Sequence, residues 1–227
     1  MPRIRLLSMW LCLVTLSIAA RPSQAGAFDG CAAQGMGGDA QLNELKNRTG
    51  TIAPRSLTVN AVRRLPSPGA VTRNRSTWTA AARALVASWE GSEASVEGTL
   101  VAAKEQGLEA ANCRRADQLD IHLWLAAAGQ SKSQAVVAEL TPRWRAVNPA
   151  WNATTVGQLA LLRTRVRLTG WLLFDEGHPD QVGKSRATLW ELHPVTKIEI
   201  LRAGSWVELA PRLVPPIAKR RRRRRHA

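Results

Sequence analysis

The length of 227 residues predicts one folded domain with appendages, and the three cysteines form no CxxC pair, which leaves redox and zinc-finger motifs without support. The formal net charge of +15 is concentrated at the two ends of the chain, because residues 1–27 hold three arginines and residues 219–225 hold seven cations. Residues 28–218 therefore carry a net charge of only about +5, which is ordinary for a solvated surface. The chain also lacks a Walker-type loop and the GxSxG and SxxK motifs, so nucleotide-hydrolysing and acyl-enzyme chemistries have no sequence support.

Residues 1–27 have the pattern of a signal peptide. Arg3 and Arg5 precede an apolar run over residues 6–20, and small residues follow between positions 23 and 27. The run is short for a membrane-spanning helix, which needs about 20 apolar residues. The sequence therefore predicts export to the periplasm or the extracellular space. The alternative is an uncleaved anchor, which would be the chain's only contact with a membrane.

Export determines how the cysteines are interpreted. Cys12 leaves with the signal peptide, so the mature chain keeps Cys31 and Cys113, an even pair in an oxidising compartment. The pattern predicts a disulfide that ties the N-terminal segment to the domain. The spacing alone is equally compatible with two free thiols.

Residues 28–91 are predicted to form an N-terminal cover with short helices. Asp39 is a suitable N-cap for a short helix with an apolar stripe at Leu42 and Leu45. Residues 51–75 contain three prolines and are interpreted as irregular covering chain. Residues 77–90 are predicted to be a helix, since apolar residues recur there at helical spacing.

Residues 92–210 alternate as strands and predict a mainly β domain. Gly170 indicates a bulge in the fourth strand, and Pro194 indicates a break or bulge in the fifth. The order of three strands, one helix and two strands is that of a five-stranded Greek-key barrel, the OB-fold. An open α+β sandwich is the alternative. The predicted strands are residues 95–104, 118–126, 134–141, a strand from 166 and 187–201, with a helix at 154–163 between the third and fourth.

Side-chain parity places a polar cluster on this barrel. If Ile121, Leu123 and Leu125 point inward, their polar neighbours share the outer face. In the OB order the third strand lies between the second and the fifth, so polar residues of all three strands gather there. The expected members are Asp120, His122, Glu139, Glu191 and His193. His178 lies in the following loop beside Asp175 and Asp180.

Three interpretations of the cluster remain open. In the first the carboxylates orient the histidines and the network is structural. In the second His122, His178 and His193 contribute to a site for a divalent metal such as zinc, although no HExxH motif is present. In the third a histidine and Glu139 or Glu191 act as the acid and base of a metal-dependent hydrolase, of the phosphodiesterase or nuclease type.

Single-stranded nucleic-acid or polyanion binding is a further alternative suggested by the fold. The chain has no tyrosine and two phenylalanines, so base stacking would need tryptophan. The available surface residues are Trp124, Trp144 and Trp171, with Arg143, Arg145, Arg165 and Arg167 nearby. Residues 211–227 are predicted to be a disordered polybasic tail that attracts polyanions without selecting among them. Its cations are Lys219, Arg220, Arg221, Arg222, Arg223, Arg224 and Arg225.

Several strings of the domain, DIHLWL, VVAELTPRWR and RATLWELHPVTKIEI, resemble a family of uncharacterised secreted bacterial proteins with DxHxW, ExTPR and WE(I/L)HPVTKIE motifs. The resemblance covers most of residues 29–208 and implies an exported compact domain, but no activity. It marks six matched polar positions, Asp120, His122, Glu139, Arg143, Glu191 and His193. Together these observations predict an exported OB-like binding or interaction module.

Overall fold

The computed structural model describes residues 30–69, 71–210 and 213 of the chain. The predicted signal peptide and the cations Lys219 to Arg225 lie outside the described residues. Of the predicted tail, Leu213 is described, and it packs against the hydrophobic core. Within the described ranges no helix has the length and apolar character needed to cross a membrane.

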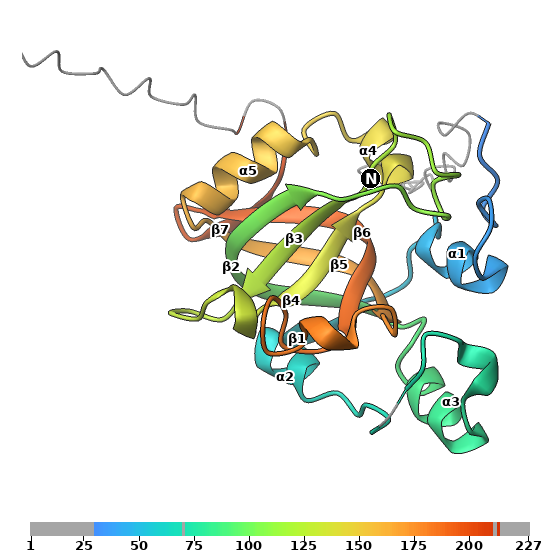
Figure 1. Cartoon of the computed structure of the whole chain (residues 1–227). Helices are drawn as coiled ribbons and strands as arrows, with labels where there is room; N and C mark the ends of the chain where they lie inside the picture. Colours follow the sequence, from blue (N-terminus) through green and yellow to red (C-terminus); the bar gives the residue numbers. More distant parts are fainter. Residues whose placement is uncertain (1–29, 70, 211–212, 214–227) are drawn as a thin grey trace, which may run out of the picture.

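Five strands close into a barrel (Figure 1). Going round the barrel, β2 pairs with β3, β3 with β4, β4 with β6, β6 with β5, and β5 with β2 again. The pair β4 and β6 is parallel and the others are antiparallel. This order confirms the predicted OB-like Greek-key barrel and excludes the open sandwich. The strands are β2 (Glu93–Glu105), β3 (Ile121–Ala126), β4 (Val136–Leu140), β5 (Arg165–Phe174) and β6 (Trp190–Arg202).

The alternation of side chains explains why the barrel closes. Ile121, Leu123 and Leu125 of β3 point into the core, as their parity predicts, and Leu168 and Leu172 of β5 meet them there. Each of these side chains is almost fully buried. Burying a leucine or isoleucine side chain stabilises the fold by about 1.5–3 kcal/mol, so this inner face sets the strand register.

The pairing of β5 with β6 is irregular where the sequence predicts a bulge. Gly170 pairs with Val195 while Leu172 pairs with Leu192, so the β6 segment around Pro194 holds an extra residue. A Cβ atom on Gly170 would lie 2.7 Å from the carbonyl oxygen of Pro194. Glycine is therefore required at this crossing because the two backbones approach too closely for a side chain.

Replacing Gly170 by alanine is expected to lower the free energy of unfolding by about 1–3 kcal/mol, the usual cost of forcing an extra methyl group into a packed site. Gly157, inside a helix with open space at its Cβ position, is the matched control. Gly157→Ala is expected to raise stability by about 0.5–1 kcal/mol because alanine is the better helix former. Urea unfolding of both variants checks the pair, and an equal effect of the two changes would contradict the assignment of Gly170.

Helices lie over the ends of the barrel. Helix α5 (Ala153–Leu161) runs between β4 and β5, where the sequence predicts the inserted helix, and buries Val156 and Leu159 in the core. In the view of Figure 1 it lies at the upper end of the barrel. A short helix that the sequence analysis does not anticipate, α4 (Pro142–Val147), follows β4 directly. Pro142 at its first position suits a helix start, because proline has no N–H to leave unsatisfied there.

The N-terminal cover is more regular than predicted. Residues 51–75 are not simply irregular chain, since they contain β1 (Arg55–Thr58), which pairs in parallel with β2, and helix α2 (Val59–Arg63). The cover also contains α1 (Ala40–Lys46), the 3-10 helix η1 (Arg75–Thr77) and α3 (Ala80–Ala87), shorter than the predicted helix. The remaining elements are η2 (Lys132–Gln134), η3 (Pro179–Gln181) and β7 (Ser205–Glu208), which pairs with β6.

Helix α1 is held by amide side chains where the sequence predicts an apolar stripe. Asn43 donates to the carbonyl oxygens of Gln34 and Gly37, and Asn47, which caps the helix, donates to those of Ala33 and Ala111. Both asparagines are buried, whereas Leu42 and Leu45 are only half-buried. The two amides thus pair three backbone carbonyls of the loop before α1 and join that loop to Ala111.

Candidate functional site

The structure brings five of the six predicted polar residues together on the outer face of β3, β4 and β6. His122 stands directly opposite Glu139 across the β3–β4 ladder, and its Nε2 lies 2.6 Å from Glu139 Oε1. His193 approaches from β6, with Nδ1 3.2 Å from Glu139 Oε2 and 3.1 Å from Glu191 Oε1. Asp120 immediately precedes β3, and its Oδ2 lies 4.0 Å from His193 Nε2.

A buried arginine that the sequence analysis does not single out extends the cluster. Arg186 precedes β6, and its guanidinium donates to Glu191 Oε2 at 2.8 Å and to Asp175 Oδ2. Asp175 in turn lies 2.7 Å from Nδ1 of His178. No periodic pattern could have identified Arg186, because it lies in the loop between β5 and β6 and not on a strand.

The other two predicted positions lie apart from the five. Arg143 is on α4, where its guanidinium donates to the carbonyl oxygen of Cys31. His178 is half exposed and reaches the cluster only through Asp175 and Arg186. The predicted metal set of His122, His178 and His193 is therefore not one site. Among the described residues, groups able to hold an ion are Asp120, Glu139 and His193, and separately Glu109, His122 and Glu139.

Burial and mutual charge shift the pKa values in the cluster. Burial raises the pKa of Asp120 to about 7. Burial would also raise the pKa of Glu139, but the neighbouring His122 and His193 hold it well below its ordinary value. Burial opposes protonation of His193, yet Glu139 and Glu191 raise its pKa to about 9. The two histidines and Glu139 thus stabilise one another's charged forms, whereas burial disfavours the charged form of Asp120.

Four of the five clustered residues are closed to solvent, whereas the His122 side chain is 12% exposed, and this burial limits the chemistry of the cluster. The side chains of Asp120, Glu139, Glu191 and His193 are 0–3% exposed. A phosphodiester or peptide bond has no route to these groups, so the arrangement does not suit a hydrolase acting on a polymer. It suits either protons shared among buried groups or a small bound ion.

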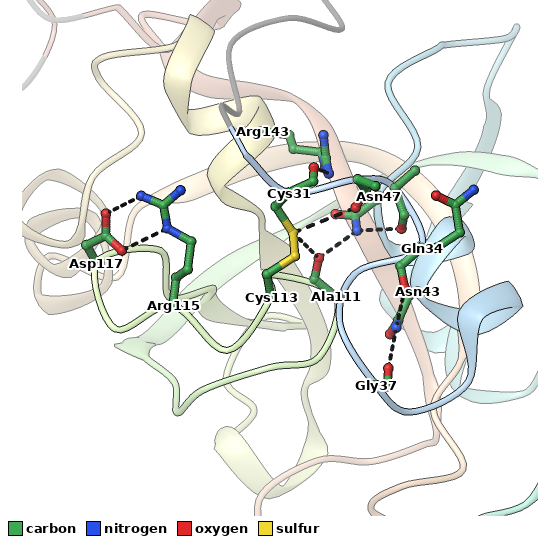
Figure 2. The surroundings of a disulfide bond; sticks show 12 residues. Cys31, Gln34, Gly37, Asn43, Asn47, Ala111, Cys113, Arg115, Asp117 and Arg143 are labelled. Carbon is green, nitrogen blue, oxygen red and sulfur yellow. Dashed lines mark hydrogen bonds and ion pairs between the residues drawn. A yellow bond between two sulfur atoms is a disulfide. The ribbon is translucent and has the colours of Figure 1, made fainter.

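The predicted disulfide between Cys31 and Cys113 is present, with the Cα atoms 5.9 Å apart (Figure 2). Figure 2 shows Asn47 and Arg143 beside the bridge, where they donate to the carbonyl oxygens of Ala111 and Cys31. The bridge also fixes the loop next to the polar cluster. Asn112, adjacent to Cys113, donates its side-chain amide to Asp120 Oδ1 at 3.0 Å. The disulfide and the position of Asp120 are therefore structurally linked.

A separate groove lies across the outer faces of β2, β5 and β6. Its volume is about 1090 Å³, and the chain at residues 49–54 and helix α4 form its other walls. The five clustered residues do not line it. Among its described lining residues, three are cationic (Arg143, Arg167, Lys197) and three are anionic (Glu93, Glu199, Glu208).

Ion pairs and hydrogen bonds engage most of these charged residues. Arg167 makes a bidentate contact with Glu199 at 2.6 and 2.7 Å, and Lys197 Nζ lies 3.1 Å from the same carboxylate. Glu93 accepts from the backbone N–H of Ile52 at 2.7 Å and from the hydroxyl of Thr196. The groove is thus polar without a dominant sign of charge.

The tryptophans predicted to stack on bases already contact other protein groups. Trp124 is buried in a small apolar cluster, and the ammonium group of Lys132 lies 3.7 Å from its ring centroid. The Arg48 guanidinium lies 4.6 Å from the ring centroid of Trp171. Trp144 lines the groove, with its indole N–H donated to the carbonyl oxygen of Arg48. The three rings do not form one stacking surface.

Comparison with known proteins gives no match to this chain among family models, curated proteins or solved structures.

Proposed function

We propose that the protein is an exported binding module that holds a neutral oligosaccharide in the groove. The balance of charge carries this proposal, since the described residues of the groove contribute equal numbers of cations and anions. A site for nucleic acid or another polyanion needs an excess of lysine and arginine to neutralise phosphate or sulfate groups. A neutral ligand needs no such excess.

The other lining residues suit a ligand rich in hydroxyl groups. Thr49, Thr51, Ser95 and Asn148 offer hydroxyl and amide groups that both donate and accept hydrogen bonds, and Trp144 adds one aromatic ring. A few polar groups around an aromatic side chain are typical of sites that orient small polar molecules. OB-folds bind oligosaccharides as well as oligonucleotides, so the ligand class is within the range of the architecture. The usual OB binding face is that of the second and third barrel strands, here β3 and β4, whereas this groove lies over β2, β5 and β6.

Export is part of the same proposal. The signal-peptide pattern of residues 1–27 supports it, as does the bridge between Cys31 and Cys113, because disulfides persist in oxidising compartments. The resemblance of the RATLWELHPVTKIEI segment to secreted bacterial proteins points in the same direction. In this setting the polybasic tail would add a second, salt-sensitive attraction to polyanions that is independent of the groove.

An array of neutral oligosaccharides, with a single-stranded oligonucleotide as the competing probe, tests the proposal. We expect the protein to bind a neutral glycan and to keep that binding at about 0.5 M salt, because no net charge is involved. Thr51→Arg places a bulky cation in the groove and should weaken binding about tenfold or more, a loss of about 1.4 kcal/mol.

Leu161→Arg is the matched control, since Leu161 is exposed on α5 and does not line the groove. It should leave glycan binding unchanged. Glycan binding that Thr51→Arg leaves intact would contradict the groove as the site. Binding of the oligonucleotide that is weakened by Thr51→Arg, with no glycan bound, would replace the proposed ligand by nucleic acid.

A further inference from the structure

Four buried polar atoms of the five clustered residues have no hydrogen-bond partner. One is His122 Nε2, on a side chain that is 12% exposed. The other three are Asp120 Oδ2, Glu139 Oε2 and His193 Nε2, each on a side chain that is at least 97% buried. Glu139 Oε2 approaches His193 Nδ1, but that contact lacks the geometry of a hydrogen bond. Buried polar atoms in proteins are nearly always paired, so three such atoms in one place point to a partner that is not a protein side chain.

The same three residues can face one ion. Asp120, Glu139 and His193 each offer a ligand atom within 4.8 Å of the ligand atoms of the other two. Carboxylate oxygens and a neutral imidazole nitrogen are ligands that zinc takes in proteins. Asp120 Oδ2 and His193 Nε2 lie 4.0 Å apart, slightly farther than two ligand atoms on one zinc ion, so binding of the ion would draw these side chains together.

In Asp120, Glu139 and His193, the polar atom that does not face the ion contacts a neighbouring side chain. Asn112 donates to Asp120 Oδ1, and Glu191 contacts Nδ1 of His193. His122 Nε2 lies 2.6 Å from Glu139 Oε1, although this contact also lacks the geometry of a hydrogen bond. Outer contacts of this kind orient metal ligands, and a carboxylate on the far nitrogen of a ligating histidine is a common form of them. Such support distinguishes the group of Asp120, Glu139 and His193, here called the inner group, from an incidental gathering of acidic residues.

We propose that Asp120, Glu139 and His193 form a structural site for one divalent metal ion, such as zinc, in the wall of the barrel. The ion supplies positive charge among the buried carboxylates of Asp120, Glu139 and Glu191, of which the Arg186 guanidinium contacts Glu191. It links β3, β4 and β6 on the outer face of the barrel, away from the hydrophobic core. The site takes no part in ligand binding, because none of its residues lines the groove.

The test uses the full exported chain, stripped with a chelator and then supplied with zinc chloride. Elemental analysis after desalting should give close to one zinc per chain, and added zinc should raise the thermal midpoint. Asp120→Asn keeps the size of the side chain and the contact with Asn112, so it should fold but bind at least tenfold more weakly and lose the rise in midpoint. Asp180→Asn, which alters an exposed acid in η3, is the control and should bind as the parent does.

His122→Asn separates the inner group from the neighbouring one of Glu109, His122 and Glu139. If Asp120→Asn abolishes zinc binding while His122→Asn retains it, the inner group is the site. Binding lost in His122→Asn and retained in Asp120→Asn would overturn the proposal in favour of the neighbouring group. Absence of bound zinc in the parent, with a midpoint insensitive to zinc, would overturn it altogether.

Discussion

Replacing Arg186 by methionine is expected to lower the free energy of unfolding by about 3–5 kcal/mol, the usual cost of removing one partner from a buried ion pair. The guanidinium is 1% exposed and contacts the carboxylates of Glu191 and Asp175 as well as the carbonyl oxygen of Thr188. Methionine fills a similar volume but removes the guanidinium from both carboxylates, which then keep the histidine contacts of His178 and His193. Urea unfolding followed by circular dichroism measures the loss.

Arg165→Met is the matched control for this change. Arg165 is 55% exposed and its Nη2 lies 3.5 Å from Glu97, an ion pair at the surface of the barrel. Such pairs contribute less than about 1 kcal/mol, so the control should unfold close to the parent. If Arg186→Met cost no more than Arg165→Met, Arg186 would not be the counter-ion of the cluster.

Removing the Cys31–Cys113 disulfide should have an effect of similar size. The bridge closes a loop with a sequence separation of 82 residues, and the chain-entropy model assigns about 4 kcal/mol to a loop of that length. We expect the Cys31→Ser, Cys113→Ser double variant to unfold at a correspondingly lower urea concentration. The parent measured in reductant should approach the same midpoint.

The control for that measurement is the double variant itself in reductant, which should unfold as it does without reductant. Mass analysis of the parent after alkylation should find no free thiol among these two cysteines. Two alkylated thiols, or a parent whose stability does not respond to reductant, would contradict the bridge as a stabilising cross-link.

The barrel and its polar face could be predicted because both follow from alternation. Once Ile121, Leu123 and Leu125 are assigned to the core, His122 must face outward, and the OB strand order then places Glu139 and His193 beside it. The irregular pairing at Gly170 and Pro194 could be predicted for a related reason, since each residue interrupts an otherwise regular strand. These features need only the period of a strand and one fold hypothesis.

The features that could not be predicted depend on tertiary contacts, which leave no periodic pattern in the sequence. Arg186 is buried because a loop folds back over β6, and the groove exists because residues 49–54 lie across strands that are distant in sequence. Strand β1 has four residues and is mostly exposed, too short for alternation to identify it. In the sequence, Asn43 and Asn47 look like exposed residues of a helix. Their burial is explained by the backbone carbonyls to which their amides donate.

The polar cluster lies at the boundary between β4 and β6, where the backbone ladder of the barrel is shortest. The ladder between these strands consists of Val137 with Glu191 and Ala138 with Leu192, so few backbone hydrogen bonds close the barrel at this point. Directly beyond the ladder, His193 and Glu139 face each other across the same boundary. Ionisable side chains thus supplement a short backbone ladder at this boundary. Resistance to opening along that line is therefore expected to depend in part on the charge of these side chains, whereas the other four strand boundaries have longer ladders.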